Sequence, residues 1–232
     1  MIAALIPMKD PAHSKQRLSG LLGPEERSLL ALAMFTDVLL AVKGAGKVDR
    51  VIILGREDKV CHIARSFECE FLPDPDGKGE TEAVAWATQV LTGSVDGLLV
   101  IPADVPLVLS EDVDTLVTES GAVPGVTLCP TRDRLGTNGV LRRPGNVMPL
   151  TFGNNSFYPH REVALRLEIP CTVVDLPRLG PDIDRPEDVA TYLNEAGPNE
   201  TSRYLASVGV RERLIGLYPQ IHSSLKEYHG RV

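Results

Sequence analysis

The stretch Leu98-Leu99-Val100-Ile101-Pro102-Ala103-Asp104 decides the fold that this sequence predicts. Its four apolar residues are typical of a short buried strand, and Asp104 follows at the carboxyl end, between the stiffening Pro102 and Pro106. In open α/β sheets, ligands bind outside the carboxyl ends of the strands. The stretch therefore predicts a sheet that holds a carboxylate at a ligand site, although Asp104 can also be read as the cap of a following helix.

Around this stretch, the first 110 residues alternate short apolar runs with longer amphipathic ones, which is the pattern of βαβ units in a mostly parallel sheet. We expect strands at 2–7, 48–54, 70–72, 98–101, 126–130, 139–142 and 171–176. We expect helices at 24–44, 58–67, 80–91, 110–117, 186–194 and, once or twice, within 201–218. The predicted fold class is α/β, with one domain over 1–195 and a C-terminal helical extension over 196–232 packed on it.

Composition restricts the classes of function. The formal net charge is -7 and 43% of the 232 residues are hydrophobic, which favours one soluble domain with a full core. The lack of a clustered excess of Lys and Arg argues against a nucleic-acid partner, and no apolar run approaches the roughly 18 residues of a membrane span. The four cysteines form no CxxC pair and the N-terminus has no signal-peptide pattern, so we expect a cytoplasmic protein with reduced thiols.

Basic side chains are concentrated directly after the first expected strand. Lys9, Lys15 and Arg17 fall within nine residues, at an edge where cations can neutralise triphosphate oxygens and the charge that develops on leaving pyrophosphate. A solvated basic loop is the alternative reading, since exposed Lys and Arg are common. The chain has no GxxxxGK[ST] sequence, which excludes a standard P-loop. The position after a buried strand favours phosphate binding.

A second acidic segment, Asp182-Ile183-Asp184-Arg185-Pro186-Glu187-Asp188, lies far along the chain. Asp182 and Asp184 alternate on an extended segment and so point the same way. Together with Asp104 they are candidate ligands for Mg²⁺, which prefers carboxylate oxygens and is commonly held against the phosphates of a nucleotide. Asp184 can instead cap the helix that starts at Pro186, and the two roles can coexist.

Small and polar residues cluster at 136–139 and 152–160. There the backbone can present N–H groups to an anion, with the hydroxyls of Thr137 and Ser156 as further donors. Two ordinary turns are the alternative. His160 is a candidate ligand or base, or simply a residue at the start of a helix. We interpret the two segments as candidate binding loops for an anionic substrate.

Taken together, these residues resemble the 2-phospho-L-lactate guanylyltransferases of coenzyme F420 biosynthesis, a family called CofC in archaea and FbiD in many bacteria. The resemblance spans residues 1–195 in a consistent order. Several linked segments are far more specific than any one motif. The matching segments are Pro7-Met8-Lys9, 14–18, 24–27, 32–34, 37–39, Pro102-Ala103-Asp104-Val105-Pro106-Leu107, Gly136-Thr137-Asn138, 152–160 and 182–188.

The resemblance implies a Rossmann-like nucleotidyltransferase fold, with a mostly parallel mixed sheet flanked by helices. It implies that a phosphorylated three-carbon acid attacks the α-phosphorus of GTP, which joins GMP to the acid and releases pyrophosphate, with Mg²⁺ as cofactor. The catalytic residues that it implies are Lys9, Lys15, Arg17 and Asp104, and the metal ligands are Asp104, Asp182 and Asp184. The nucleotide-binding residues that it implies are Pro7, Lys9, Lys15 and Arg17, to which we add Glu80 and Glu82 from the residues themselves, and the acceptor-binding residues are Thr137, Asn138, Gly153, Asn155, Ser156 and His160.

The chain departs from the family near the base, where Gly77-Lys78-Gly79-Glu80-Thr81-Glu82-Ala83 replaces a common Gly-Leu-Asn-Ala segment. A carboxylate of Glu80 or Glu82 can pair with N1–H and N2–H₂ of guanine, or the change alters the choice of base. The acceptor stays open among 2-phospho-L-lactate, phosphoenolpyruvate and 3-phosphoglycerate, as do the number of metal ions, a homodimer and the role of 197–232. The alternative functions are a molybdopterin guanylyltransferase-like or CTP-using enzyme of the same fold, and a nucleotide-binding protein without turnover.

Overall fold

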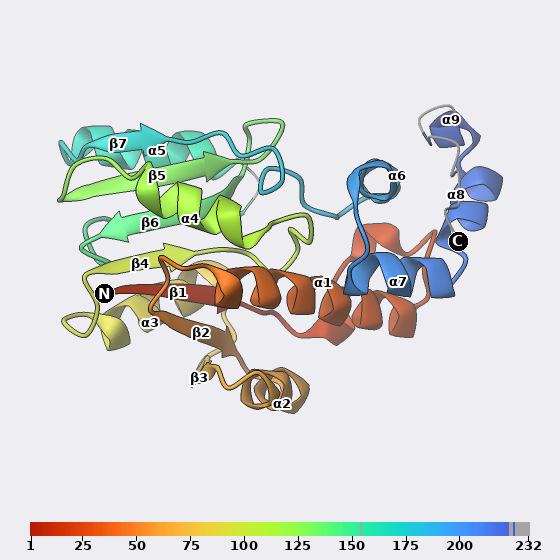
Figure 1. Ribbon diagram of the computed structural model, residues 1–232, viewed down its shortest axis with the longest axis horizontal. Helices are drawn as coiled ribbons and strands as arrows, with labels where there is room; N and C mark the ends of the chain where they lie inside the picture. Colours follow the sequence, from red (N-terminus) through yellow and green to blue (C-terminus); the bar gives the residue numbers. More distant parts are fainter. Residues whose placement is uncertain (154, 223–224, 226–232) are drawn as a thin grey trace.

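The computed structural model describes residues 1–153, 155–222 and 225. Within them, seven strands form one sheet in the order β3-β2-β1-β4-β6-β5-β7 (Figure 1). In this part of the chain β6 runs antiparallel to both of its neighbours and the other pairs are parallel, which confirms the expected mostly parallel mixed sheet. The strands are β1 (Ile2–Pro7), β2 (Arg50–Gly55), β3 (Glu70–Pro73), β4 (Gly97–Val100), β5 (Gly125–Pro130), β6 (Thr137–Arg143) and β7 (Cys171–Val173).

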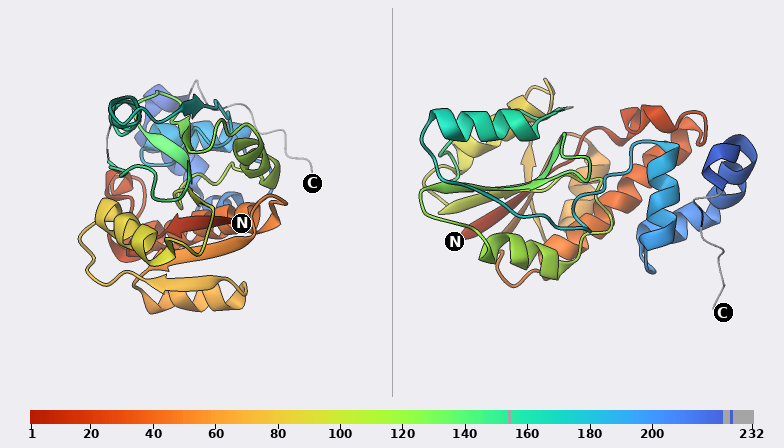
Figure 2. Two further views of the ribbon diagram at one scale, coloured as in Figure 1. Left: turned by 90° about the vertical axis from the view of Figure 1, so that its left-hand side faces the viewer. Right: turned by 90° about the horizontal axis from the view of Figure 1, so that it is seen from above.

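Helices cover both faces of the sheet (Figure 2). On one face, α1 (Pro24–Gly44), α2 (Asp58–Ser66) and α4 (Ser110–Thr118) share an apolar cluster with the strands. On the other face, α3 (Glu80–Leu91) and α5 (Phe157–Arg166) form a second cluster with them. The result is the layered α/β arrangement that the alternation of apolar runs predicts.

The central strand β1 shows why its sequence is apolar throughout. Ile2, Ala4 and Ile6 belong to the cluster on one face, whereas Ala3 and Leu5 belong to the cluster on the other. Successive side chains of a strand point to opposite faces, so a strand with helices on both sides must be apolar at every position. The strand ends where the chain enters the basic loop, which is therefore held at the edge of the sheet.

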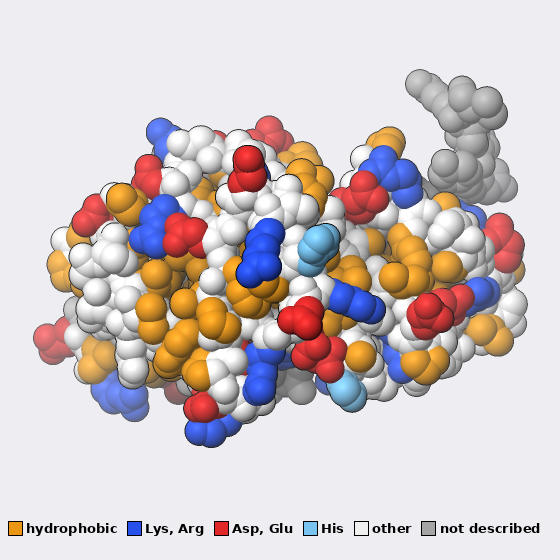
Figure 3. All heavy atoms as spheres, turned by 90° about the horizontal axis from the view of Figure 1, so that it is seen from below, with side chains coloured by type: hydrophobic (Ala, Val, Ile, Leu, Met, Phe, Trp, Pro, Cys, Tyr) orange, Lys and Arg blue, Asp and Glu red, His pale blue; other side chains and the backbone are white. Residues whose placement is uncertain are grey.

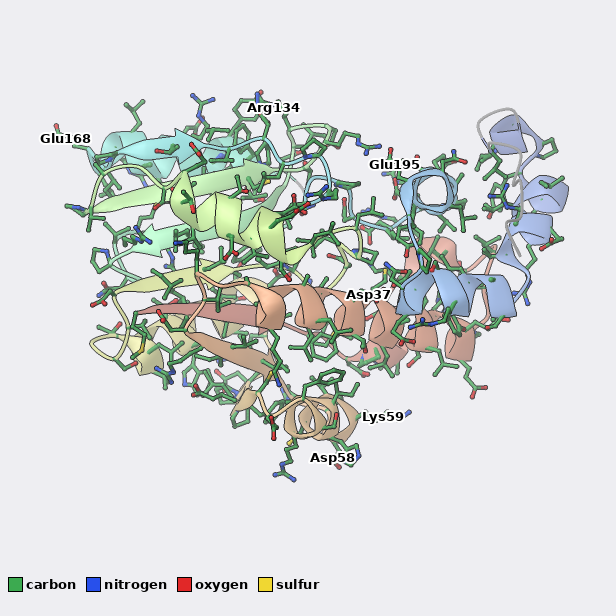
Figure 4. All side chains as sticks on the ribbon, viewed as in Figure 1. Asp37, Asp58, Lys59, Arg134, Glu168 and Glu195 are labelled. Carbon is green, nitrogen blue, oxygen red and sulfur yellow. The ribbon has the colours of Figure 1, made fainter. Side chains whose placement is uncertain are left out.

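The C-terminal part of the chain is helical, and α7 packs on α1. Asp37 of α1 lies where these two helices meet (Figure 4). Its carboxylate accepts hydrogen bonds from the backbone N–H groups of Glu200 at 2.9 Å and Thr201 at 2.8 Å. The last part of the predicted extension, 223–224 and 226–232, lies outside the described residues. The helices here are α6 (Pro186–Glu195), α7 (Glu200–Ser207), α8 (Val210–Leu217) and α9 (Pro219–His222).

Three segments differ from the expectation. α5 begins at Phe157, inside a stretch expected to be a loop. Pro159 does not prevent this helix because it stands in the first turn, where a backbone N–H has no acceptor within the helix. β6 begins at Thr137, so that residue and Asn138 belong to a strand rather than to a turn. β7 ends at Val173, earlier than the expected 176.

The charge distribution on the surface is relevant to nucleic-acid binding, and the length and polarity of the helices are relevant to membrane insertion. On the face shown in Figure 3, side chains of both charge signs are interspersed, and its coloured residues form no continuous basic surface of the kind that binds nucleic acid. Among the helices of the described residues, none combines the length and the apolar character needed to cross a bilayer.

Candidate active site

Two adjoining cavities open at the carboxyl ends of β1 and β4. One has a volume of about 510 Å³ and is lined by the basic loop that follows β1. The other has a volume of about 640 Å³ and is lined by the start of β6 and the loop before α5. Arg17, Glu80, Asp104 and Asp184 border both cavities. Four separate parts of the chain thus meet at one boundary, where strand ends place ligand-binding residues.

Lys15 lies at this boundary with its ammonium between two carboxylates. Nζ is 2.6 Å from Oδ2 of Asp104 and 2.8 Å from Oδ1 of Asp184, and only 6% of the side chain is exposed. Burial alone would lower the pKa of Lys15, but the two carboxylates outweigh burial and raise it. The residue has a left-handed backbone with φ of 55°, which costs a non-glycine residue about 1 kcal/mol or more. Two ion pairs offset that strain.

Three carboxylates converge on the same point. Oxygen atoms of Asp104, Asp182 and Asp184 all lie within 4.8 Å of one another, and a backbone hydrogen bond from Ile183 N–H to the carbonyl of Asp104 holds the two segments together at 3.2 Å. Burial, with the two neighbouring carboxylates, raises the pKa of Asp182 to about 6. Burial would also raise the pKa of Asp184, but Lys15 outweighs it and holds that pKa below its ordinary value.

The capping alternatives for Asp104 and Asp184 do not describe the structure. The N-cap of α4 is Leu109, five positions beyond Asp104. The N-cap of α6 is Arg185, and the carboxylate of Asp188 accepts the N–H groups of Arg185 at 2.7 Å and of Asp184 at 3.0 Å. Because Asp188 serves the helix end, the side chain of Asp184 is free to face Lys15.

The cations of the basic loop, which lines the smaller of the two cavities, differ in their surroundings. Arg17 is half exposed, with Nη1 at 3.3 Å from Oδ2 of Asp184. Lys9 is 69% exposed and pairs with Oε2 of Glu80 at 3.1 Å. Burial raises the pKa of Glu80 in spite of Lys9. Glu80 therefore lies inside the site, whereas Glu82 is exposed and is not among the lining residues of these two cavities.

A third cavity, of about 400 Å³, shares lining residues with the cavity of the basic loop and extends toward the end of β2. Pro7, Gly55, Arg56, Gly79 and Glu80 are among the residues that line it. Sequence reasoning missed Gly55 and Arg56, although they lie at and just after the carboxyl end of β2. The rule that pointed to Asp104 at the end of β4 applies equally to this strand.

Five of the residues predicted to bind the acceptor line the larger cavity: Thr137, Asn138, Gly153, Asn155 and Ser156. The hydroxyls of Thr137 and Ser156 are 3.3 Å apart. The amide nitrogen of Asn138 donates to the carbonyls of Leu179 and Gly180 at 3.1 and 3.0 Å. Arg185 and Asp188 also line this cavity and were not predicted, although they stand in the acidic motif.

His160 lies behind this lining and is 1% exposed. Nε2 accepts the backbone N–H of Thr151 at 3.0 Å, and Nδ1 is 3.2 Å from Oγ1 of Thr137. Because Nε2 is an acceptor, the proton of a neutral ring is on Nδ1 and points at Thr137. Burial, and then the charge of Arg142, lower the pKa of His160 to about 4. The ring thus holds Thr137 in place and does not itself line the cavity.

Comparison with known proteins identifies the family that the chain matches. Residues 2–214 match the family described as guanylyl transferase CofC like. A phosphoenolpyruvate guanylyltransferase from Rubrobacter xylanophilus is 34% identical over 84% of this chain and 95% of its own length. A 3-phospho-D-glycerate guanylyltransferase from Colwellia psychrerythraea is 34% identical over 80% and 88%. A 2-phospho-L-lactate guanylyltransferase from Methanothermobacter thermautotrophicus is 30% identical over 87% and 88%.

Solved structures agree on the fold. A crystal structure from Desulfovibrio desulfuricans G20, named for nucleotide-diphospho-sugar transferases, has a TM-score of 0.74 at 15% identity and covers 91% of this chain and 97% of its own. A nucleotidyl transferase from Methanothermobacter has a TM-score of 0.60 at 14% identity, with 89% and 99% covered. At these identities the likeness concerns the fold alone, and it is the nucleotidyltransferase fold that the resemblance implied.

Proposed function

The chain belongs to the CofC-like guanylyl transferase family and is an enzyme of the nucleotidyltransferase class, and we propose that it transfers the guanylyl group of GTP to a phosphorylated three-carbon acid. An oxygen of the acceptor phosphate attacks the α-phosphorus of GTP. The bond from the α-phosphorus to the bridging oxygen breaks, and pyrophosphate leaves with the bonding electrons. A new P–O–P bridge joins GMP to the acid, as a step of coenzyme F420 biosynthesis.

The observation that carries this proposal is the pairing of Lys15, which lines the cavity of the basic loop, with Asp104 and Asp184, which border both this cavity and the larger one. Its ammonium lies 2.6 and 2.8 Å from carboxylates of Asp104 and Asp184, and these three residues face the point where a triphosphate on one side would meet an acceptor phosphate on the other. Phosphoryl and nucleotidyl transfer need positioning and neutralisation of charge more than covalent chemistry. A boundary built from cations and carboxylates meets that need.

We propose Asp104, Asp182 and Asp184 as the ligands of Mg²⁺. The donor set fits a hard divalent cation, because it is made of carboxylate oxygens within 4.8 Å of one another and two of them already hold the cation of Lys15. When bound, magnesium supplies positive charge to the phosphate oxygens. Lys15 and Arg17 add further positive charge on the nucleotide side.

The acceptor needs no general base, since a phosphate monoester is already largely ionised near pH 7. The acceptor cavity instead offers hydroxyls of Thr137 and Ser156 and the backbone at Gly153, all of which can donate to phosphate or carboxylate oxygens. Arg17 and Arg185 line the same cavity and match an acid with two negatively charged groups. The relatives are named for phosphoenolpyruvate, 3-phospho-D-glycerate and 2-phospho-L-lactate, which are acids of this kind.

The test crosses GTP, CTP, ATP and UTP with these three acids in the presence of Mg²⁺ and measures release of pyrophosphate. We expect release only when a nucleotide and an acid are both present, with GTP the best donor. Mass spectrometry of the product identifies the acid that is used. Failure of every combination would overturn the transfer reaction. A preference for CTP would instead overturn the choice of guanine and point to the segment around Glu80.

A further inference from the structure

The loop that lines the acceptor cavity is held by side chains from two helices on its outer side. His160 of α5 accepts the N–H of Thr151 at 3.0 Å. Thr81 of α3 accepts the next N–H, that of Phe152, with Oγ1 at 2.9 Å, and its hydroxyl is 3.4 Å from the carbonyl of the same residue. Two successive backbone groups are thus each bound by a side chain that does not itself line the cavity.

Thr81 is placed to affect the acceptor and not only the loop. Phe152 and Gly153 line the acceptor cavity, and Gly153 has φ of 138°, a conformation that glycine adopts freely. In a trans peptide the N–H of Gly153 points opposite to the carbonyl of Phe152, and that carbonyl lies 3.4 Å from the hydroxyl of Thr81. The hydrogen bonds from Thr81 therefore fix the peptide that joins Phe152 to Gly153, both of which line the cavity.

Thr81 also connects this loop to the nucleotide side. It follows Glu80, which lines all three cavities of the site, and both residues stand in the first turn of α3. A threonine in a first turn commonly bonds to its own helix, but the hydroxyl here reaches Phe152, which lies 71 positions away in the chain. One residue of α3 faces the nucleotide, and the next holds the acceptor loop.

We propose that Thr81 is a positioning residue for the acceptor acid, acting through the Thr81–Phe152 hydrogen bonds. The inference rests on the proposed function, because it assigns the loop to the acceptor and not to the nucleotide. A net contribution of about 1 kcal/mol for such a bond corresponds to roughly a fivefold effect on binding. We therefore expect Thr81→Val, which keeps the shape and removes the hydroxyl, to raise KM for the acid about fivefold while KM for GTP stays within about twofold.

Matched variants separate this role from a general effect on the helix. Thr81→Ser keeps the hydroxyl and is expected to restore the acceptor KM. Thr92→Val makes the same change at the other end of α3, where the hydroxyl donates to the carbonyl of Thr88 in the same helix. It is expected to leave both KM values unchanged. An equal rise in both KM values for Thr81→Val, or no rise for the acid, would overturn the proposal.

A second measurement does not depend on activity. Amide hydrogen exchange of Phe152 is measured in the full chain without substrate, and we expect it to be about fivefold faster in Thr81→Val and unchanged in Thr92→Val. Unaltered exchange at Phe152 would show that Thr81 does not hold the loop, whatever the kinetics. If the wild-type chain released no pyrophosphate with any pair of substrates while exchange at Phe152 responded as expected, the proposed function would fall and the anchoring of the loop would stand.

Discussion

Replacing Lys15 by Met tests whether the two carboxylates share a cation that a metal ion can replace. Lys15 is 6% exposed in its side chain and contacts Asp104 and Asp184 at 2.6 and 2.8 Å. The methionine fills much of the same space but leaves three carboxylates within 4.8 Å of one another. Without a metal ion these charges repel, so we expect the variant to be less stable in EDTA than the wild type.

The loss of stability expected for Lys15→Met depends on how deeply the paired side chains are buried. Removing one partner of a fully buried ion pair costs about 3 to 5 kcal/mol. The side chains of Asp104 and Asp184 are 32% and 37% exposed, and water reduces the cost, so we expect about 2 kcal/mol in this case. For a chain of this size that loss lowers Tm by roughly 4 to 8 °C. In the wild type, a metal ion that binds the carboxylates must displace the ammonium of Lys15, which costs the same, about 2 kcal/mol. The variant lacks this cost, so it should bind the metal ion about thirtyfold more tightly in the absence of nucleotide.

Two measurements check these values, with Lys78→Met as the control. Thermal unfolding in EDTA and in Mg²⁺ gives the loss of stability and its recovery, and titration with Mn²⁺ followed by electron paramagnetic resonance gives the affinity. Lys78 is 67% exposed and pairs with Asp76, which is 56% exposed, so its replacement should leave stability nearly unchanged. If Lys15→Met matched the wild type in EDTA, or bound Mn²⁺ no more tightly, the carboxylates would not be sharing a cation with Lys15.

Three further variants test other parts of the structure. Asp104→Asn should lower kcat for pyrophosphate release by about 10² or more, and turnover near the wild-type value would remove Asp104 from the reacting centre. His160 has a pKa lowered to about 4, so as pH falls below about 6.5 protons bind this residue in the unfolded chain first, and the stability that neutral His160 contributes above that pH should drop by about 2 kcal/mol at pH 5. Asp182, whose pKa is raised to about 6, shifts stability in the opposite direction, so the drop is measured as the difference between the wild type and His160→Gln in urea unfolding at pH 8 and pH 5. Asp37→Ala removes the acceptor for the N–H groups of Glu200 and Thr201 and should cost about 1 to 2 kcal/mol, with faster proteolysis after Glu195. Unchanged proteolysis would contradict the docking of α7 through Asp37.

The parts of the site that depend on strand ends could be predicted from the sequence. The apolar run before Asp104 can be recognised from the sequence, because a strand that is covered on both faces must be apolar at successive positions. The same holds for the basic loop after β1. The burial of Lys15 could not be predicted, because this residue stands in a polar loop. Only the folded chain brings Asp104 and Asp184 close enough to enclose its ammonium.

The residues that sequence reasoning misplaced are those whose roles depend on long-range hydrogen bonds. His160 reads as a candidate ligand or base, or as a residue at the start of a helix. It does lie near the start of α5, and both of its ring nitrogens face Thr137 and Thr151 instead of a ligand. Thr81 gave no signal at all, since one hydroxyl near the start of a helix has many uses. Its partner, Phe152, lies 71 positions away in the chain, and no local pattern connects the two.

The placement of Thr137 follows from the direction of β6. The carboxyl ends of the parallel strands β1, β2 and β4 meet at one edge of the sheet, and an antiparallel strand must present its amino end at that edge. β6 is antiparallel to β4, so its first residues, Thr137 and Asn138, reach the larger cavity, while Asp104 reaches the same cavity from beyond the end of β4. A search limited to the carboxyl ends of strands therefore finds Asp104 and misses Thr137. Thr137 and Asn138 were recognised as polar, but they were interpreted as part of a loop because the start and direction of β6 cannot be read from its composition.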